Sequence, residues 1–379
     1  MIYLDHAATT SVAQEVIETV DDILQSFWGN PSSLHRLGFQ AQKKLEQARK
    51  TIAEYMGVRP KTLVFTSCAT ESNNAVLTGT FGHAAQSAKT GRNLVVSAVE
   101  HSSIYEWAKV YEKAGGAVRW IPVDDTGRIT PEAVLPLVDE NTALVCAMWV
   151  NNELGTVSPV EELARAVHQK NPRARVLVDG VQAFGKAKMA LASGEIDYFS
   201  ATGHKIGVPK GIGLLYIREG LALQPLLLGG GQERGMRPGT ENVAYACGLA
   251  RGVERMQTCP DVRDLSAQVR SFFADQPGVR INSPAEACSP YILNLGFTGV
   301  RSEVLLHMME EKEIFLSSGS ACTGGAVSHV LQAVGVPKDV IYGSVRLSFG
   351  PENTKEEIEE FCPILQNAVE QIRSLIGNA

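Results

Sequence analysis

Residues 176–205 read VLVDGVQAFGKAKMALASGEIDYFSATGHK. An apolar strand pattern at 176–178 ends on Asp179, and a second strand pattern at 198–200 runs into a polar turn that ends on Lys205. Five more strand patterns alternate with helical ones around this segment, at residues 62–65, 94–97, 118–123, 143–150 and 213–217. This alternation predicts an α/β fold with a large, mostly parallel sheet covered by helices on both faces.

The pattern of the sequence changes after residue 258. A glycine-rich stretch at 229–240 leads into a predicted helix at 241–256, and the later pattern runs helix, strand, strand, helix, strand, helix. Asn353 is the predicted N-cap of the last helix, and Pro363 is expected to kink it. Residues 158–161, Ser-Pro-Val-Glu, predict a capping box for an earlier helix. The sequence thus predicts a large domain and a smaller α+β domain.

The composition of the 379-residue chain excludes several classes of protein. A net charge of -6 without a dense Lys/Arg run gives no reason to expect a nucleic-acid partner. No stretch reaches the ~18 apolar residues of a membrane span, and residues 1–6 lack a leader pattern, so we expect a cytoplasmic protein with no membrane partner. The cysteines lie at positions 68, 146, 247, 259, 288, 322 and 362, without metal-ligand spacing. This predicts mostly reduced thiols, with neither a disulfide framework nor a metal site.

Asp179 and Lys205 are candidates for a site at the carboxyl edge of the sheet. The carboxyl ends of parallel strands line a ligand crevice, and Asp179 lies there with Gln182 just beyond it. A carboxylate can keep a pyridinium nitrogen protonated while a lysine forms a Schiff base, which is what pyridoxal 5'-phosphate (PLP) requires as an electron sink. The alternatives are a solvated turn lysine at 205 and a helix N-cap at 179.

Two further strand ends carry groups that such a cofactor needs. Residues 67–71, Ser-Cys-Ala-Thr-Glu, join a strand to a predicted helix, where backbone N–H groups and the helix dipole favour an anion. Thr202 and His204 could add donors from a neighbouring loop. His101 follows another strand and could stack on a ring and exchange protons near neutral pH. Ordinary capping residues at 67–71 and a structural histidine at 101 are the alternatives.

Asn152, Arg346 and Cys322 are candidates for binding and transforming a substrate. An amide and a guanidinium can hold a carboxylate, since arginine presents a fork of two donors. Arg346 also fits a surface charge on an edge strand. Cys322 lies in residues 317–325, Ser-Ser-Gly-Ser-Ala-Cys-Thr-Gly-Gly, a segment in which a thiol could be accessible. An ordinary turn residue is the alternative for Cys322.

Together these motifs resemble the cysteine desulfurases, the NifS/IscS-like members of the class V aminotransferase superfamily with the fold-type I PLP architecture. The resemblance covers essentially the whole chain, with several motifs in one order. They lie at residues 3–10, 29–33, 69–74, 100–101, 150–153, 179–182, 204–205, 234–240, 317–323 and 346–348. The resemblance implies a large PLP-binding domain at 17–257, and a small domain at 1–16 and 258–379 that carries Cys322.

The resemblance also implies a role for each candidate residue. Lys205 would carry PLP as a Schiff base, Asp179 would pair with the pyridine nitrogen, and Gln182 would bond the ring hydroxyl. His101 would stack on the ring. Asn152 and Arg346 would bind the carboxylate of L-cysteine, and Asn152 would also contact the cofactor. The groups implied for the phosphate are Ala69, Thr70, Thr202, His204 and, in a homodimer, Thr240 of the partner subunit.

The implied reaction converts L-cysteine to L-alanine, with Cys322, Lys205 and His101 as catalytic residues. The sulfur would pass through a persulfide on Cys322 to an acceptor such as an iron–sulfur cluster scaffold protein. Selenocysteine lyase, another C–S lyase or an aminotransferase on the same fold is the nearest alternative, and a non-catalytic persulfide carrier is a rival of a different class. Thr202 stands where serine is usual, residues 180–181 are Gly-Val, and the segment after Cys322 is short, which bears on the choice of acceptor.

Overall fold

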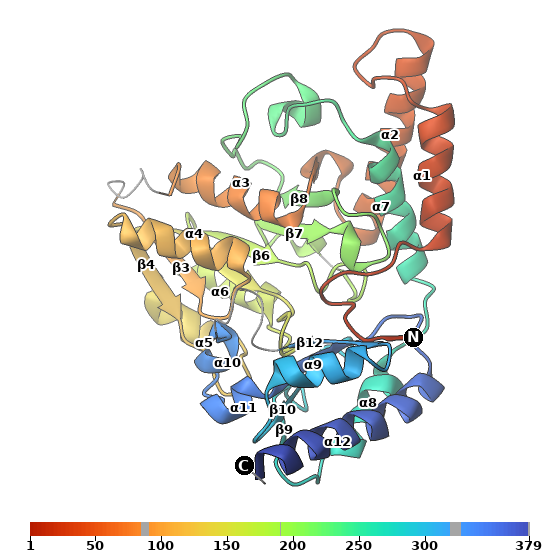
Figure 1. Cartoon of the computed structure of the whole chain (residues 1–379). Coiled ribbons are helices and arrows are strands. Elements are labelled where there is room, and N and C mark those ends of the chain that lie inside the picture. The colour runs from red at the N-terminus through yellow and green to blue at the C-terminus, as the bar shows by residue number, and fades with distance from the viewer. Residues whose placement is uncertain (85–90, 190, 319–326, 378–379) are drawn as a thin grey trace.

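The structure is a computed structural model that describes residues 1–84, 91–189, 191–318 and 327–377. Figure 1 shows two parts, a large sheet with its helices and a smaller sheet near the C-terminus. The chain begins at the smaller part, crosses to the larger one and returns to end beside its starting point. The N-terminal residues therefore lie between the two parts.

A seven-stranded sheet forms the centre of the larger part. Its strands lie in the order β2, β8, β7, β6, β5, β3, β4. β8 runs antiparallel to both of its neighbours, and the remaining neighbours are parallel. This confirms the predicted α/β fold and all seven predicted strands. The strands are β2 (Leu63–Thr66), β3 (Asn93–Ser97), β4 (Ala117–Ile121), β5 (Thr142–Met148), β6 (Arg175–Asp179), β7 (Tyr198–Thr202) and β8 (Gly213–Ile217).

Helices cover both faces of this sheet (Figure 1). In β6, Leu177 packs into the core that contains α3 and α4, whereas Val176 and Val178 pack into the core that contains α6 and α7. Successive strand residues point to opposite faces, so a strand covered on both sides is apolar throughout. The helices are α1 (Gln14–Ser26), α2 (Arg36–Met56), α3 (Ala69–Phe81), α4 (Ser102–Lys113), α5 (Pro131–Val134), α6 (Val160–Lys170) and α7 (Val243–Met256). The 3-10 turns are η1 (Pro60–Thr62), η2 (Leu135–Leu137), η3 (Leu191–Ser193), η4 (Gly203–Lys205) and η5 (Gln232–Gly235).

The smaller part is built on a four-stranded antiparallel sheet with the order β12, β13, β10, β9. Its core also holds Ile2 and Leu4, because β1 pairs in parallel with β11. The strands are β1 (Ile2–Tyr3), β9 (Val279–Ile281), β10 (Ile292–Phe297), β11 (Ile314–Phe315), β12 (Ser317–Ser318) and β13 (Ser344–Ser348). The helices are α8 (Arg263–Phe273), α9 (Ser302–Glu310), α10 (His329–Ala333), α11 (Lys338–Tyr342) and α12 (Lys355–Gly377). Residues of α10 and α11 pack into the large core, and the exact division into two domains stays a prediction.

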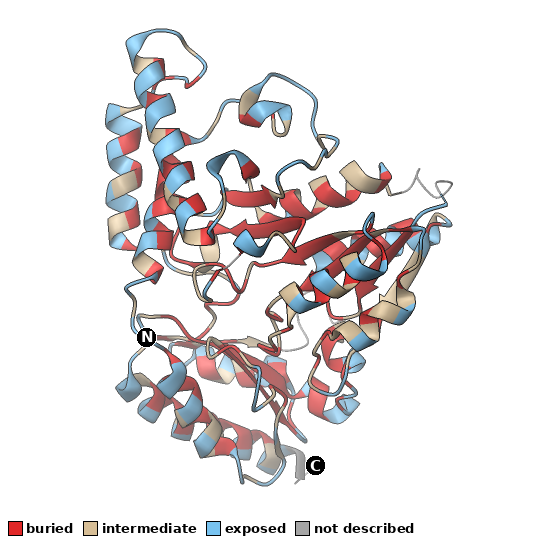
Figure 2. Ribbon diagram, turned by 180° about the vertical axis from the view of Figure 1, so that it is seen from behind, coloured by how far each residue is buried: buried red, intermediate tan, exposed pale blue. Residues whose placement is uncertain are grey.

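Figure 2 shows that the central strands of the large sheet and β10 and β13 of the small one are almost entirely buried, while most helices bury one side only. Asp179, Thr202 and Arg346 are exceptions to the apolar interior, since each is a polar strand residue that is less than a tenth exposed. Charged groups are rarely buried without a partner or a function. No helix in the described part of the chain is long and apolar enough to cross a membrane.

Two predicted helix starts are displaced. The capping box at 158–161 was wrong, because Ser158 Oγ accepts a hydrogen bond from Ile129 N at 3.2 Å and α6 has Pro159 as its N-cap. α7 begins at Val243 rather than at 241, with Asn242 as its N-cap. The hydroxyl of Ser158 therefore bonds a distant loop, whereas the local pattern predicted that it bonds the helix.

The last helix is also capped by a different residue. Asn353 Oδ1 accepts from Gly350 N at 2.9 Å and therefore serves the preceding turn, so its prediction as the N-cap was wrong. Thr354 and Glu357 form the capping box instead, because each backbone N–H is bonded by the other's side chain at 3.2 Å. Pro363 lies inside α12 as predicted.

A buried ion pair anchors the glycine-rich stretch 229–240. Glu233 accepts from Arg49 at 2.7 and 2.8 Å and from Phe65 N at 3.0 Å. Glu233 and Arg234 have φ of 45° and 58°, in the left-handed region, which costs a non-glycine residue about 1 kcal/mol. The three hydrogen bonds to Glu233 offset this cost and fix the path of the stretch that ends at Thr240.

Candidate active site

A chain of hydrogen bonds links Asp179, at the end of β6, to His101, just before α4. Asn73 is completely buried, and its Nδ2 donates to Asp179 Oδ2 at 3.0 Å and to Ser103 Oγ at 2.9 Å. Ser103 Oγ in turn lies 2.9 Å from His101 Nδ1. Val181 N donates to the other oxygen of Asp179 at 3.1 Å. The carboxylate is therefore held in one orientation from two sides.

His101 is the N-cap of α4, and its Nδ1 accepts from Ser103 N at 3.2 Å. Because Nδ1 accepts, the neutral ring carries its proton on Nε2. The residue is exposed, yet protein surrounds the ring closely enough that burial lowers its pKa, while Asp179 raises this pKa and Lys205 lowers it. The ring is consequently neutral near neutral pH and lies within electrostatic reach of both other groups.

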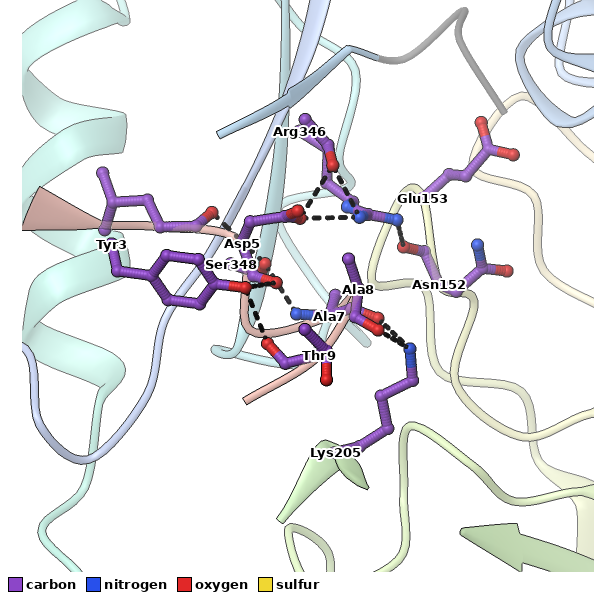
Figure 3. Close-up of polar contacts among 12 residues, drawn as sticks. Tyr3, Asp5, Ala7, Ala8, Thr9, Asn152, Glu153, Lys205, Arg346 and Ser348 are labelled. Atoms are coloured by element: carbon purple, nitrogen blue, oxygen red, sulfur yellow. Dashed lines mark hydrogen bonds and ion pairs between the residues drawn. The ribbon is translucent and has the colours of Figure 1, made fainter. Parts of the chain in front are cut away.

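Lys205 ends the turn after β7 and points toward the N-terminal segment (Figure 3). Its Nζ donates to the carbonyl oxygens of Ala7 and Ala8 at 2.6 and 2.5 Å. Gln182 Nε2 donates to the same oxygen of Ala7 at 3.0 Å. The backbone of residues 7–8 therefore joins two of the residues that the resemblance assigns to the cofactor.

Arg346, on β13, is held by acceptors from three parts of the chain (Figure 3). Its Nη2 donates to Asp5 Oδ1 at 2.9 Å and to Ser317 Oγ at 3.1 Å, and its Nη1 donates to the carbonyl oxygen of Asn152 at 3.1 Å. The residue is 7% exposed, which excludes a surface charge on an edge strand. Nε is buried and has no partner among the described residues, so the guanidinium keeps one donor for a further acceptor.

The start of α3 presents backbone N–H groups without a side-chain cap. Cys68 is the N-cap and makes no side-chain cap bond. Ala69 is buried, whereas Thr70 is exposed. The first N–H groups of a helix are unpaired within the helix, and the helix dipole favours an anion there. This turn thus retains the anion-binding groups that the sequence predicts.

Thr202 and His204 already have protein partners. Thr202 Oγ1 donates to the carbonyl oxygen of Ile212 at 3.2 Å, and His204 Nδ1 lies 3.3 Å from Thr9 Oγ1. Burial and, after it, the charge of Lys205 lower the pKa of His204 to about 4. His204 is therefore neutral at pH 7 in this state, and its phosphate contact stays a prediction.

For Thr240 and Cys322, the described part of the chain shows no hydrogen bond to the other predicted site residues. Thr240 is exposed and lines a cavity of about 250 Å³ together with Ser67 of the same chain. Its approach from a second subunit stays a prediction. Cys322 lies outside the described residues, but Ser317, five positions earlier, pairs with Arg346 across β12 and β13. The segment that carries Cys322 thus starts next to the predicted substrate-binding guanidinium.

The whole chain is similar to known proteins. The sequence profile of the aminotransferase class-V family matches residues 2–361. "Cysteine desulfurase 2" of Trichormus variabilis is 38% identical over 382 residues, which cover 99% of this chain and 94% of the relative. A solved NifS-like protein has a TM-score of 0.88 at 35% identity, with both chains covered completely.

The chain belongs to the cysteine desulfurases of the class-V aminotransferase family. Members of this family are PLP-dependent enzymes, and this chain is one of them. A second solved structure, SspA in complex with cysteine, has a TM-score of 0.82 at 30% identity and covers 93% of this chain and 100% of SspA.

The described residues fit PLP. Its aldehyde requires a lysine amine, and its pyridine nitrogen requires a fixed carboxylate. Its aromatic ring can stack on a neutral imidazole, and its phosphate requires an uncapped helix start. Gly213 supports this fit, because a Cβ there would lie 2.6 Å from the backbone of Cys68 and would push the phosphate turn away. Among the described residues, no group of three or more His, Cys, Asp or Glu side chains could hold a metal ion.

Several residues that shape the site were not predicted. Asn73 holds Asp179, Asp5 holds Arg346, and the backbone of Ala7 receives Lys205. Asn73 was part of a quoted motif, and its position one helical turn after Ala69 was the signal that could have placed it beside the site. The contact between Asp5 and Arg346 joins residues 341 positions apart and has no local signal.

The lowered pKa of His204 predicts acid sensitivity of the cofactor-free protein. Its pKa is about 4 when folded and 6.5 as the reference value, so the unfolded chain binds more protons between these pH values. The free energy of unfolding should fall as the pH drops through this window. Urea unfolding at pH 7 and pH 4.5 measures how much the free energy of unfolding falls between the two pH values. This fall should be about 1–3 kcal/mol smaller in His204→Gln than in the wild type. If the free energy of unfolding fell by the same amount in both proteins, the lowered pKa would not belong to His204.

Proposed function

We propose that the chain acts as a PLP-dependent cysteine desulfurase that converts L-cysteine to L-alanine and stores the sulfur as a persulfide on Cys322. One observation carries the proposal, namely the convergence of Lys205, Asp179 and His101. Hydrogen bonds through Asn73 and Ser103 link Asp179 to His101, and Lys205 shares the carbonyl oxygen of Ala7 with Gln182. Family membership and the binding of cysteine by the similar SspA support the proposal. The roles of individual residues below belong to this proposal.

Arg346 and Asn152 would bind the carboxylate of cysteine. The guanidinium is fixed by Asp5, Ser317 and the carbonyl oxygen of Asn152, so it loses little freedom when a substrate binds. Its free Nε supplies a donor. Asn152 bonds the guanidinium through its backbone, and its side-chain amide would complete a two-point contact with the carboxylate.

PLP, when bound, supplies an electron sink for the electrons of a broken Cα–H bond. Lys205 would hold the cofactor and, once its Nζ is free, take the Cα proton of cysteine. Asp179, fixed by Asn73 and Val181, would keep a proton on the pyridine nitrogen. His101 would stack on the ring, and its neutral imidazole can receive a proton near neutral pH. Gln182 would bond the ring hydroxyl.

The remaining cofactor contacts would hold the phosphate. The uncapped start of α3 supplies the backbone N–H groups of Ala69 and Thr70. Thr202 and His204 would contribute from the loop after β7, and Thr240 would come from the partner subunit. His204 would exchange its contact with Thr9 for the phosphate.

Cys322 would be the nucleophile of the sulfur transfer. Its thiolate attacks the sulfur of cysteine, a new S–S bond forms, and the C–S bond of the substrate breaks. The three-carbon remainder takes up protons and leaves as alanine, so cysteine and one thiol become alanine and one persulfide. No external oxidant is needed, and the persulfide can pass to an acceptor thiol.

Product analysis tests the function as a whole. Incubation with L-cysteine should yield alanine and sulfane sulfur in equal amounts, because each turnover transfers one sulfur atom. Pyruvate with ammonia would instead indicate a C–S β-lyase, and a keto acid would indicate an aminotransferase. Either result would overturn the proposal.

A homodimer in which Thr240 of the partner subunit completes each site is a further part of the proposal. Its support is the exposure of Thr240 at the end of an anchored glycine-rich stretch. Mixed dimers of a Lys205→Ala subunit and a Thr240→Val subunit would contain one fully intact site if Thr240 acts across the interface. We expect these mixed dimers to recover PLP affinity close to that of the wild type at that site. Without recovery, Thr240 acts within its own chain.

The acceptor and the location of the protein also belong to the proposal. An iron–sulfur scaffold protein is the acceptor class that the IscS-like sequence motifs favour, and a relative in Bacillus subtilis is named "Putative cysteine desulfurase IscS 1". The six cysteines of the described residues are all free thiols, which fits a reducing compartment such as the cytoplasm.

A further inference from the structure

A second lysine, Lys186, lies behind Lys205 and has no role in the mechanism above. It follows β6 in the turn that begins at Asp179, and its Nζ donates to Gln182 Oε1 at 3.3 Å. The other end of the same amide donates to the carbonyl oxygen of Ala7, which also receives Lys205 Nζ. A short path of hydrogen bonds thus connects the two ammonium groups.

The backbone around Lys186 is fixed, so the side chain starts from a defined position. Tyr55 Oη accepts from Gly185 N at 3.0 Å and donates to the carbonyl oxygen of Ala187 at 3.0 Å. These two bonds clamp the residues on either side of Lys186. Its Nζ also lies 5.3 Å from the ring centre of Tyr291, within the range of a cation–π contact.

The charged groups that face Lys186 in the described part of the chain are three cations and one carboxylate. Among the described residues, no carboxylate forms an ion pair with Lys186, and Glu352 is paired with Arg255. The facing groups are His6, Lys205, Arg255, Tyr291, Arg346 and Glu352. The space among them measures about 10 Å³, room for about one water molecule and for no larger counter-ion.

This arrangement has an electrostatic consequence. Burial and the charges of Lys205 and Arg346 lower the pKa of Lys186 to about 7. Charge repulsion is mutual, so a protonated Lys186 must also disfavour a positive charge on Lys205. The charge of Lys205 is one cause of the lowered pKa of Lys186, so a neutral Lys205 lets Lys186 keep its proton. A lysine that takes a proton from a substrate has to be neutral before it does so.

We propose that Lys186 is a positioning residue for Lys205: anchored on Gln182, its ammonium repels a second positive charge and keeps the amine of Lys205 in the neutral form that accepts the Cα proton. The inference rests on the proposed role of Lys205. Lys186 would influence the protonation of Lys205 through its charge and would not contact the substrate.

The test is a spectroscopic pH titration of the holoenzyme. The visible absorbance of the bound cofactor reports protonation of its linkage to Lys205 and can be followed from about pH 5 to about pH 10 without turnover. Lys186→Met should raise the apparent pKa of this linkage by on the order of one pH unit, because a neighbouring cation is lost. Lys186→Gln keeps a hydrogen-bond donor without charge and should show the same rise, while Lys186→Arg, with a permanent charge, should show none.

Lys188→Met is the matched control, since Lys188 is exposed two residues further on. It should titrate like the wild type. Borohydride reduction and peptide mapping separate this inference from the proposed function. With the cofactor trapped on Lys205 in every variant, an unchanged titration of both Lys186→Met and Lys186→Gln would overturn the inference alone. Trapping on Lys186 in the wild type would overturn the proposed role of Lys205 itself.

Discussion

Replacing Cys322 with alanine should reduce the production of alanine and sulfide from L-cysteine by about a thousandfold or more, because the acceptor of the sulfur is lost. The absorbance of the bound cofactor and its change on addition of cysteine should stay as in the wild type. Those steps use Lys205, Asp179 and Arg346, which the substitution leaves unchanged. The measurement is the rate of alanine formation beside the absorbance spectrum.

Cys68→Ala is the matched control for this experiment. Cys68 is a half-buried thiol next to the phosphate turn and has no assigned role. The control should retain sulfide production. In the wild type, mass spectrometry after a short incubation with cysteine should find one additional sulfur on the peptide of Cys322 and none on that of Cys68. An undiminished rate in Cys322→Ala would mean that sulfur leaves by direct elimination.

Lys205→Ala should have an effect of similar size for a different reason. The variant loses both the group that carries the cofactor and the base that takes the Cα proton, and loss of the base alone typically costs roughly 10²–10⁴-fold. The fold should persist, because Gln182 still donates to Ala7. The expected results are no cofactor fixed by borohydride and no measurable alanine, whereas Lys188→Ala should behave like the wild type.

Chemical rescue distinguishes loss of the amine from general damage. A small primary amine added to Lys205→Ala can occupy the space left by the side chain and restore part of the rate, because it supplies the missing base. A variant that retains full activity without any amine would show that another residue carries the cofactor.

The strands were predictable because each is a short apolar run bounded by turn residues, and strands buried on both faces must be apolar throughout. All seven strands of the large sheet lie where the pattern placed them. Helix starts were less predictable. Ser158 and Asn353 are good capping residues by type, but the side-chain oxygen of each accepts a hydrogen bond from a loop N–H instead of one from the following helix. The choice between such partners depends on loop geometry, which a local pattern does not contain.

The residue types of the site were predictable from the sequence, but the residues that hold them in place were only partly predictable. Asp179, His101 and Lys205 follow strands whose carboxyl ends meet at one edge of a parallel sheet, so their proximity follows from topology. The hydrogen bonds from Asn73 and the shared carbonyl of Ala7 arise from segments that are remote in sequence. The contacts at Ala7 could not be inferred without the packing of the N-terminus, whereas the position of Asn73 one helical turn after Ala69 was a usable signal.

The sequence by itself determined the α/β fold, the family and the reactive side chains, because these depend on local apolar periodicity and on residue types at strand ends. Only the tertiary structure decided that Arg346 is buried and held by Asp5, and that the charges of Lys205 and Arg346 act on Lys186. Both are electrostatic properties that depend on distance and burial in three dimensions, which local periodicity and residue type do not contain.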